Sequence, residues 1–165
     1  MPARTWYKRF RAAAYVNAVV WLAWTVAILL PFPPFSYLQP IIVGSGPGVW
    51  FLVGYILFVT VSVVGFTAIS SLSFVMEVNE LRELNYGSVL VGFILLYAGT
   101  LIGCILLGIA GAIGGYVVVI QGATADVAHS VLAAYVDPIT VASVSAVAGA
   151  ALTIYGMATA KASKH

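Results

Sequence analysis

Four long stretches of this chain contain no charged side chain. They are Ala12–Leu30, Val49–Met76, Tyr86–Ile120 and Pro138–Ala160. A helix needs about 20 apolar residues to cross the hydrocarbon core of a bilayer, and each stretch meets that requirement. We therefore predict an all-α integral membrane protein built as a four-helix transmembrane bundle. The predicted spans cover residues 12–30, 49–76, 87–112 and 138–160.

The composition agrees with a chain that lies mainly within a membrane. Hydrophobic residues make up 62% of the 165 residues and charged residues 7%, whereas soluble domains carry about 25% charged residues. Because the four spans use most of the chain, residues 1–165 are predicted to form a single transmembrane domain. The formal net charge of +2 is too small to indicate nucleic-acid binding, so the expected surroundings are a lipid bilayer and no nucleic acid.

The basic residues are distributed unevenly along the chain. All seven precede the first stretch, lie between the second and third, or follow the fourth: Arg4, Lys8, Arg9, Arg11, Arg82, Lys161 and Lys164. Cytoplasmic segments of membrane proteins carry an excess of Lys and Arg. This pattern predicts a multi-pass protein of the cell membrane with the N- and C-termini both cytoplasmic.

The third stretch is too long for a straight span. As one helix it would measure about 52 Å, against a hydrocarbon core of roughly 30 Å. We predict a span that ends near Ala112, with Tyr116–Ile120 packed above the membrane; a single steeply tilted helix is the alternative. Gly108, Gly111 and Gly115 offer either a bend or a close contact with another helix.

A short outer-surface helix is expected before the last span, over residues 126–136. Asp137 would cap the start of the last span and Pro138 would occupy its first turn. This outer helix and the uncharged loop over residues 31–48 would form a cap at the outer face.

The last span contains small residues at intervals of three and four. Ser145, Gly149 and Gly156 belong to this face, which would let another helix approach closely. A packing role is also predicted for Asn17, the most polar residue within the spans. Antiparallel packing of the first two spans would place it at the depth of Ser70, Ser71 and Ser73, where an interhelical hydrogen bond could form. The alternative interpretation is that these polar side chains line a path for a substrate.

Asp126 and His129 stand three residues apart on the predicted outer helix, a spacing that could bind zinc or copper. Helix capping by Asp126 is the simpler interpretation. No cofactor is expected from the sequence, and haem bound by His129 is the alternative. A second haem ligand would be His165, Met76, Met157 or His129 of another subunit.

Three glutamates on the segment after the second span recur every third residue. Glu77, Glu80 and Glu83 would form a solvated acidic arc or pair with Arg4, Lys8 and Arg11.

Function is indicated mainly by what the spans lack. None contains Asp, Glu, Lys, Arg or His, whereas ion-coupled transporters place ionisable groups there. No nucleophile and base can be paired, which argues against an enzyme. We expect a non-enzymatic membrane subunit, either a homo-oligomer or an accessory to other membrane subunits, for example in a respiratory complex. Two alternatives remain: a binding module for haem, quinone or lipid near Trp21, Trp24, Tyr55 and Tyr97, and a small uncoupled permease.

Overall fold

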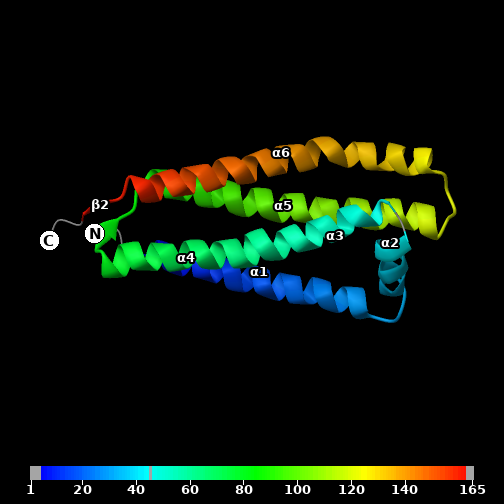
Figure 1. Cartoon of the computed structure of the whole chain (residues 1–165), viewed down its shortest axis with the longest axis horizontal. Helices are drawn as coiled ribbons and strands as arrows, with labels where there is room; N and C mark the ends of the chain where they lie inside the picture. The colour runs from blue at the N-terminus through cyan, green and yellow to red at the C-terminus, as the bar shows by residue number, and fades with distance from the viewer. Residues whose placement is uncertain (1–4, 45, 163–165) are drawn as a thin grey trace.

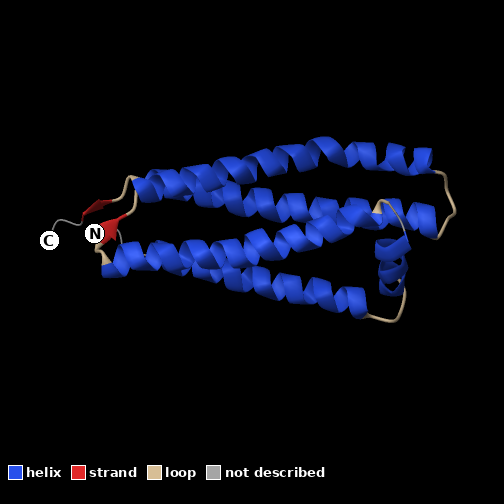
Figure 2. Cartoon of the chain, viewed as in Figure 1, coloured by secondary structure: helices blue, strands red, loops and turns tan. Residues whose placement is uncertain are grey.

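The computed structural model describes residues 5–44 and 46–162 and is almost entirely helical (Figures 1 and 2). Four helical rods are long and apolar enough to cross a membrane, which confirms that part of the prediction. The rods are Trp6–Leu29 (α1), Gly48–Asn79, Tyr86–Val119 (α5) and Ala125–Ala158 (α6).

The second rod changes its helical type along its length. It comprises α3 (Gly48–Leu57), the π-helical η2 (Phe58–Gly65), α4 (Phe66–Phe74) and the π-helical η3 (Val75–Asn79). Such wide turns are rare and occur frequently at functional sites. The rod contacts α1 through the π-helical η2 and, more extensively, through the regular helix α4.

Helix α5 does not break near Ala112, which contradicts the predicted break and agrees with the alternative prediction of a single helix. The helix runs for 34 residues to Val119. The glycines expected to bend it instead lie against other elements, where their small size is needed. A methyl group on Gly108 would lie 2.5 Å from the Trp24 ring, and one on Gly111 would collide with the main chain of Phe51.

Helix α6 is also continuous, so the separate outer-surface helix is wrong and Asp137 is not a helix cap. The 34 residues of α6 include Pro138 in the interior. Proline removes one main-chain donor, and apolar helices tolerate this where the freed carbonyl finds other partners. Residues 126–136 are the first turns of this long helix, and Thr124 occupies its N-cap position.

The two ends of the bundle differ. At one end a short strand, β1 (Arg82–Glu83), pairs antiparallel with β2 (Lys161–Ala162). Helix α1 begins at the same end of the bundle (Figure 1). At the other end η1 (Phe35–Tyr37) and α2 (Leu38–Gly44) lie across the helix ends. The expected cap is therefore formed by the first loop alone, because residues 116–137 belong mainly to α5 and α6.

The rods pack in the order α1, second rod, α5 and α6. Aromatic rings fill the core near the strand end of the bundle, where the rings of Phe10, Phe66 and Phe93 contact one another and the first two are fully buried. Helix α6 packs along α5 and has no comparable contact with another described element. It therefore forms one edge of the bundle.

Candidate functional site

The N-terminus of α1 is held by a buried carboxylate from the second rod. Glu77 is 2% exposed, and its two oxygens accept hydrogen bonds from the main-chain nitrogens of Trp6 (3.3 Å) and Tyr7 (3.2 Å). These nitrogens have no partner within the helix, and a negative charge also interacts favourably with the positive end of the helix dipole. Glu77 thus acts as a cap supplied from 70 residues away in the chain.

The acidic arc predicted from the sequence is not one surface. Glu80 pairs with Arg82 (3.2 Å), Glu83 lies in β1, and Glu77 is buried. Among the described residues no ion pair joins these glutamates to Lys8 or Arg11. Arg4 lies outside the described residues.

Asn17 lies opposite a different serine from those expected. Its side-chain amide donates to the main-chain oxygen of Ser62 in η2 over 3.0 Å, and both residues are buried. The expected serines lie nearer the strand end of the bundle. Ser70 donates to the main-chain oxygen of Tyr7 (2.8 Å), Ser71 donates to that of Thr67 within its own helix, and Ser73 is fully buried. Sequence reasoning placed all four residues at one depth, whereas the structure separates Asn17 from the serines.

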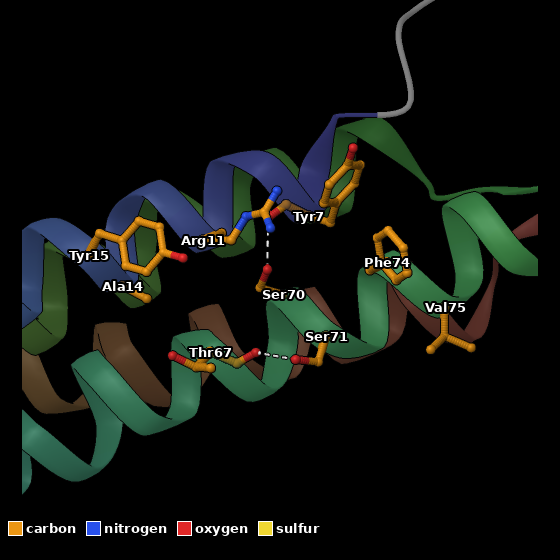
Figure 3. Close-up of a pocket in the computed structure, with 9 residues that line it drawn as sticks. All are labelled: Tyr7, Arg11, Ala14, Tyr15, Thr67, Ser70, Ser71, Phe74 and Val75. Atoms are coloured by element: carbon orange, nitrogen blue, oxygen red, sulfur yellow. Dashed lines mark hydrogen bonds between the residues drawn. The ribbon is translucent and has the colours of Figure 1, made fainter.

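A cavity of about 390 Å³ lies between α1 and α4 at the end of the bundle that carries the basic residues (Figure 3). We call it the α1–α4 cavity. On the α1 side Tyr7, Arg11 and Tyr15 line it, and Thr67, Ser70 and Ser71 line it from α4. It combines a guanidinium, three aliphatic hydroxyls and two phenol rings on an otherwise apolar surface. The sequence analysis missed it, because Arg11 and the serines belong to different predicted segments.

The small-residue face of the last span packs inside the same chain. A methyl group on Gly149 would collide with the main-chain nitrogen of Leu96, and one on Gly156 would lie 2.6 Å from Val89. Ser145 is partly buried on this helix. The helix that approaches closely is therefore α5 of this chain. Sequence analysis missed the partner glycines on α5, Gly92 and Gly99, although their spacing of seven residues marks one helix face.

Two further glycines of α5 face the second rod and α1. Gly111 contacts Phe51, Gly108 contacts Trp24, and Gly115 is buried on the same helix. Gly54 of α3 also lies in the contact between α3 and α5, because a methyl group there would lie 2.8 Å from the main-chain oxygen of Cys104. Helix α5 thus uses glycines to bring two neighbouring helices within main-chain distance.

Asp126 and His129 lie near the start of α6, both exposed. No group of three metal-ligating side chains occurs among the described residues. His129 lines an apolar cavity of about 560 Å³ together with Trp50 and Leu132. Met157 lies near the opposite end of α6, roughly 42 Å along the helix, and Met76 belongs to the distant η3. His165 lies outside the described residues.

The aromatic residues suggested as a ligand site pack against one another. Trp24 and Trp21 contact the ring of Tyr55, and the Tyr55 hydroxyl forms a hydrogen bond with Thr25 (2.8 Å). Tyr97 belongs to another cluster, stacked on Phe93. These four residues therefore do not surround one site.

The fold and its cavities define the chain as a helical protein with four apolar, potentially membrane-spanning rods. Comparison with protein-family models, curated proteins and solved structures found no match.

Proposed function

We propose that this protein is a non-enzymatic, multi-pass subunit of the cell membrane that self-associates through the outward face of α6. The proposal has two parts, the orientation of the bundle and the surface through which copies meet. Each rests on a different feature of the described residues.

The orientation follows from the charges. Lys8, Arg9 and Arg11 belong to the first turns of α1. Helix α1 begins at the end of the bundle where β1 and β2, which contain Arg82 and Lys161, pair (Figure 1). The positive-inside bias favours a cytoplasmic location for this end. Both termini would then be cytoplasmic, and α2 would lie at the outer surface.

The outward face of α6 carries the self-association proposal. Its exposed side chains from residue 140 to 151 are all Val or smaller: Thr140, Val141, Ser143, Val144, Val147, Ala148 and Ala151. The exposed faces of the other rods carry larger groups, such as Leu22 on α1 and Ile102 on α5. Between helices in a bilayer, small side chains favour association because the backbones can pack closely.

The burial of α6 supports the same conclusion. In the most apolar 18-residue stretch of α6 only 11% of the residues are buried, against 39% in the corresponding stretch of α5. A rod that contacts one neighbour leaves most of its circumference for lipid or for another helix. Because the inward small residues are already used against α5, the outward face is the one available to a second copy.

The test compares matched pairs of substitutions on two outward faces. Val147→Leu with Ala151→Leu enlarges the α6 face, and Val19→Leu with Ala23→Leu does the same on α1. Val147 is 71% exposed and Val19 is 66% exposed, so neither pair disturbs the core. Native mass spectrometry of each protein, gently extracted from its membrane, gives the number of copies.

We expect multiples of 17.3 kDa for the wild-type protein and the α1 pair, and monomers for the α6 pair. A monomeric wild-type protein, or an α6 pair that remains oligomeric, would overturn self-association through this face. Other polypeptides in the wild-type complex, lost only in the α6 pair, would instead identify an accessory subunit.

A further inference from the structure

Among residues 5–44 and 46–162, no carboxylate forms an ion pair with Arg11 at the α1–α4 cavity. The one ion pair formed between described residues joins Arg82 and Glu80, and the contact of the Arg11 guanidinium is with the ring of Tyr7 at 5.5 Å. A guanidinium stays charged and presents a planar set of donors that matches the oxygens of a phosphate. The cavity therefore offers one strong site for a phosphate group.

The hydroxyls opposite Arg11 offer acceptors. Ser70 donates to the main-chain oxygen of Tyr7 (2.8 Å), Ser71 to that of Thr67 (3.0 Å), and Thr67 to that of Val63 (2.7 Å). Each hydroxyl has a single hydrogen to donate, so what remains available is its lone pairs. A ligand that fits this arrangement carries a phosphate for Arg11 and an N–H or O–H donor for the hydroxyl oxygens.

The surroundings of the cavity match the depth of a lipid headgroup. Lys8 and Arg9 lie on the same turns of α1, where basic side chains meet the anionic surface of a membrane. Beyond Arg11 the exposed surface of α1 becomes apolar through Tyr15 and Val19, both 66% exposed. Polar groups at the helix end and an apolar stripe beside them suit a headgroup joined to an acyl chain.

We propose that the α1–α4 cavity binds a phospholipid whose headgroup joins a phosphodiester to a hydrogen-bond donor, as in phosphatidylethanolamine or phosphatidylglycerol. The phosphodiester lies against Arg11, and the ammonium or hydroxyl group donates to Thr67 and Ser71. A choline headgroup satisfies only the first contact, because its quaternary nitrogen carries no hydrogen. This lipid site does not depend on the self-association of α6.

The test measures binding of three lipids with the same acyl chains to the full-length protein in detergent. Palmitoyl-oleoyl phosphatidylethanolamine, phosphatidylglycerol and phosphatidylcholine are added in turn, and native mass spectrometry counts the bound molecules. Arg11→Gln removes the cation. Its control is Arg9→Gln, which removes the same charge from the same helix, because Arg9 lies over the Trp6 ring at 4.6 Å and does not line the cavity.

We expect the first two lipids to bind the wild-type protein about tenfold more tightly than phosphatidylcholine, since each adds a hydrogen bond to the hydroxyl oxygens that choline cannot donate. Arg11→Gln should lower their affinity about tenfold, and Arg9→Gln should leave it unchanged. Thr67→Val combined with Ser71→Ala should abolish the preference for phosphatidylethanolamine over phosphatidylcholine, which are both zwitterionic, while retaining binding through Arg11. If Arg11→Gln loses helical content, this double variant carries the test alone.

Two results would overturn the proposal. Equal affinity of the wild-type protein for the three lipids would mean that the cavity does not distinguish between the headgroups. A loss of affinity in Arg9→Gln equal to that in Arg11→Gln would mean that the lipids are attracted to basic residues in general. Soluble glycerophosphoethanolamine distinguishes a membrane lipid from a free phosphodiester. If it displaces the lipid at equal concentration, the site belongs to a soluble ligand and the lipid assignment is wrong.

Discussion

The side-chain amide of Asn17 donates to the main-chain oxygen of Ser62 over 3.0 Å, which joins the middle of α1 to the π-helical segment η2. Asn17 is 1% exposed. A buried amide without a partner would destabilise an apolar helix bundle, so this bond fixes which face of α1 meets the second rod. The acceptor belongs to the main chain, and any residue at position 62 could supply it.

Asn17→Ala should therefore lower the free energy of unfolding by about 0.6–2 kcal/mol, the range measured for hydrogen bonds between helices in bilayers. Equilibrium unfolding in mixed micelles measures this. Ser62→Ala is the control, because it keeps the carbonyl that accepts the bond. If both variants lose the same stability, the interhelical bond is not the source of the effect.

Glu77→Ala should destabilise the first turn of α1. The change removes both acceptors of the Trp6 and Tyr7 main-chain nitrogens, and losing a helix cap costs about 0.5–2 kcal/mol. Hydrogen–deuterium exchange should rise at the first turn of α1. Glu80→Ala is the matched control, because its pair with Arg82 is half-exposed and such pairs contribute only ~0–1 kcal/mol. Unchanged exchange at Trp6 and Tyr7 in Glu77→Ala would contradict the capping role.

The sequence predicts the four helical rods well, because the absence of charge over a span is a property of each segment by itself. It does not predict what Glu77 contacts, since its partners belong to a segment about 70 positions earlier. From the three-residue spacing of Glu77, Glu80 and Glu83, the sequence predicts either a solvated acidic arc or pairing with basic side chains near the N-terminus, and neither prediction includes a carboxylate that caps the main chain of α1. The depth of Asn17 was misjudged for a related reason. The offset between two antiparallel helices depends on their packing, which local sequence does not specify.

Helix breaks were the least predictable feature. Gly111 and Pro138 are both residues that weaken an isolated helix, yet α5 and α6 continue through them. At Gly111 the reason is packing against Phe51. The glycine stripe on α6 was recognised from the sequence, but its partner on α5 was not, because the stripe would suit a neighbour from the same chain or from another copy equally well.

Gly149→Ala should separate α5 from α6. The added methyl group would collide with the main chain of Leu96, and overpacking of this kind costs about 1–3 kcal/mol. Gly65→Ala is the control within a helical rod, because the nearest atom to its methyl group would lie 3.5 Å away. We expect that variant to be neutral or to gain up to about 1 kcal/mol from helix propensity. Thermal unfolding followed by circular dichroism compares the two, and a Gly149→Ala protein as stable as Gly65→Ala would show that the helices do not pack this closely.

Pro138→Ala should stabilise α6 without increasing the helical content of the protein. Pro138 is exposed in the helix interior, so alanine restores a main-chain donor and removes the ring, a gain of about 1–3 kcal/mol. Pro40→Ala is the control, because Pro40 lies in the first turn of α2, where its missing N–H has no helical acceptor. Far-UV circular dichroism and thermal unfolding measure both variants. A rise in helical content in Pro138→Ala would mean that the wild-type chain breaks at Asp137, and a single continuous α6 would then be wrong.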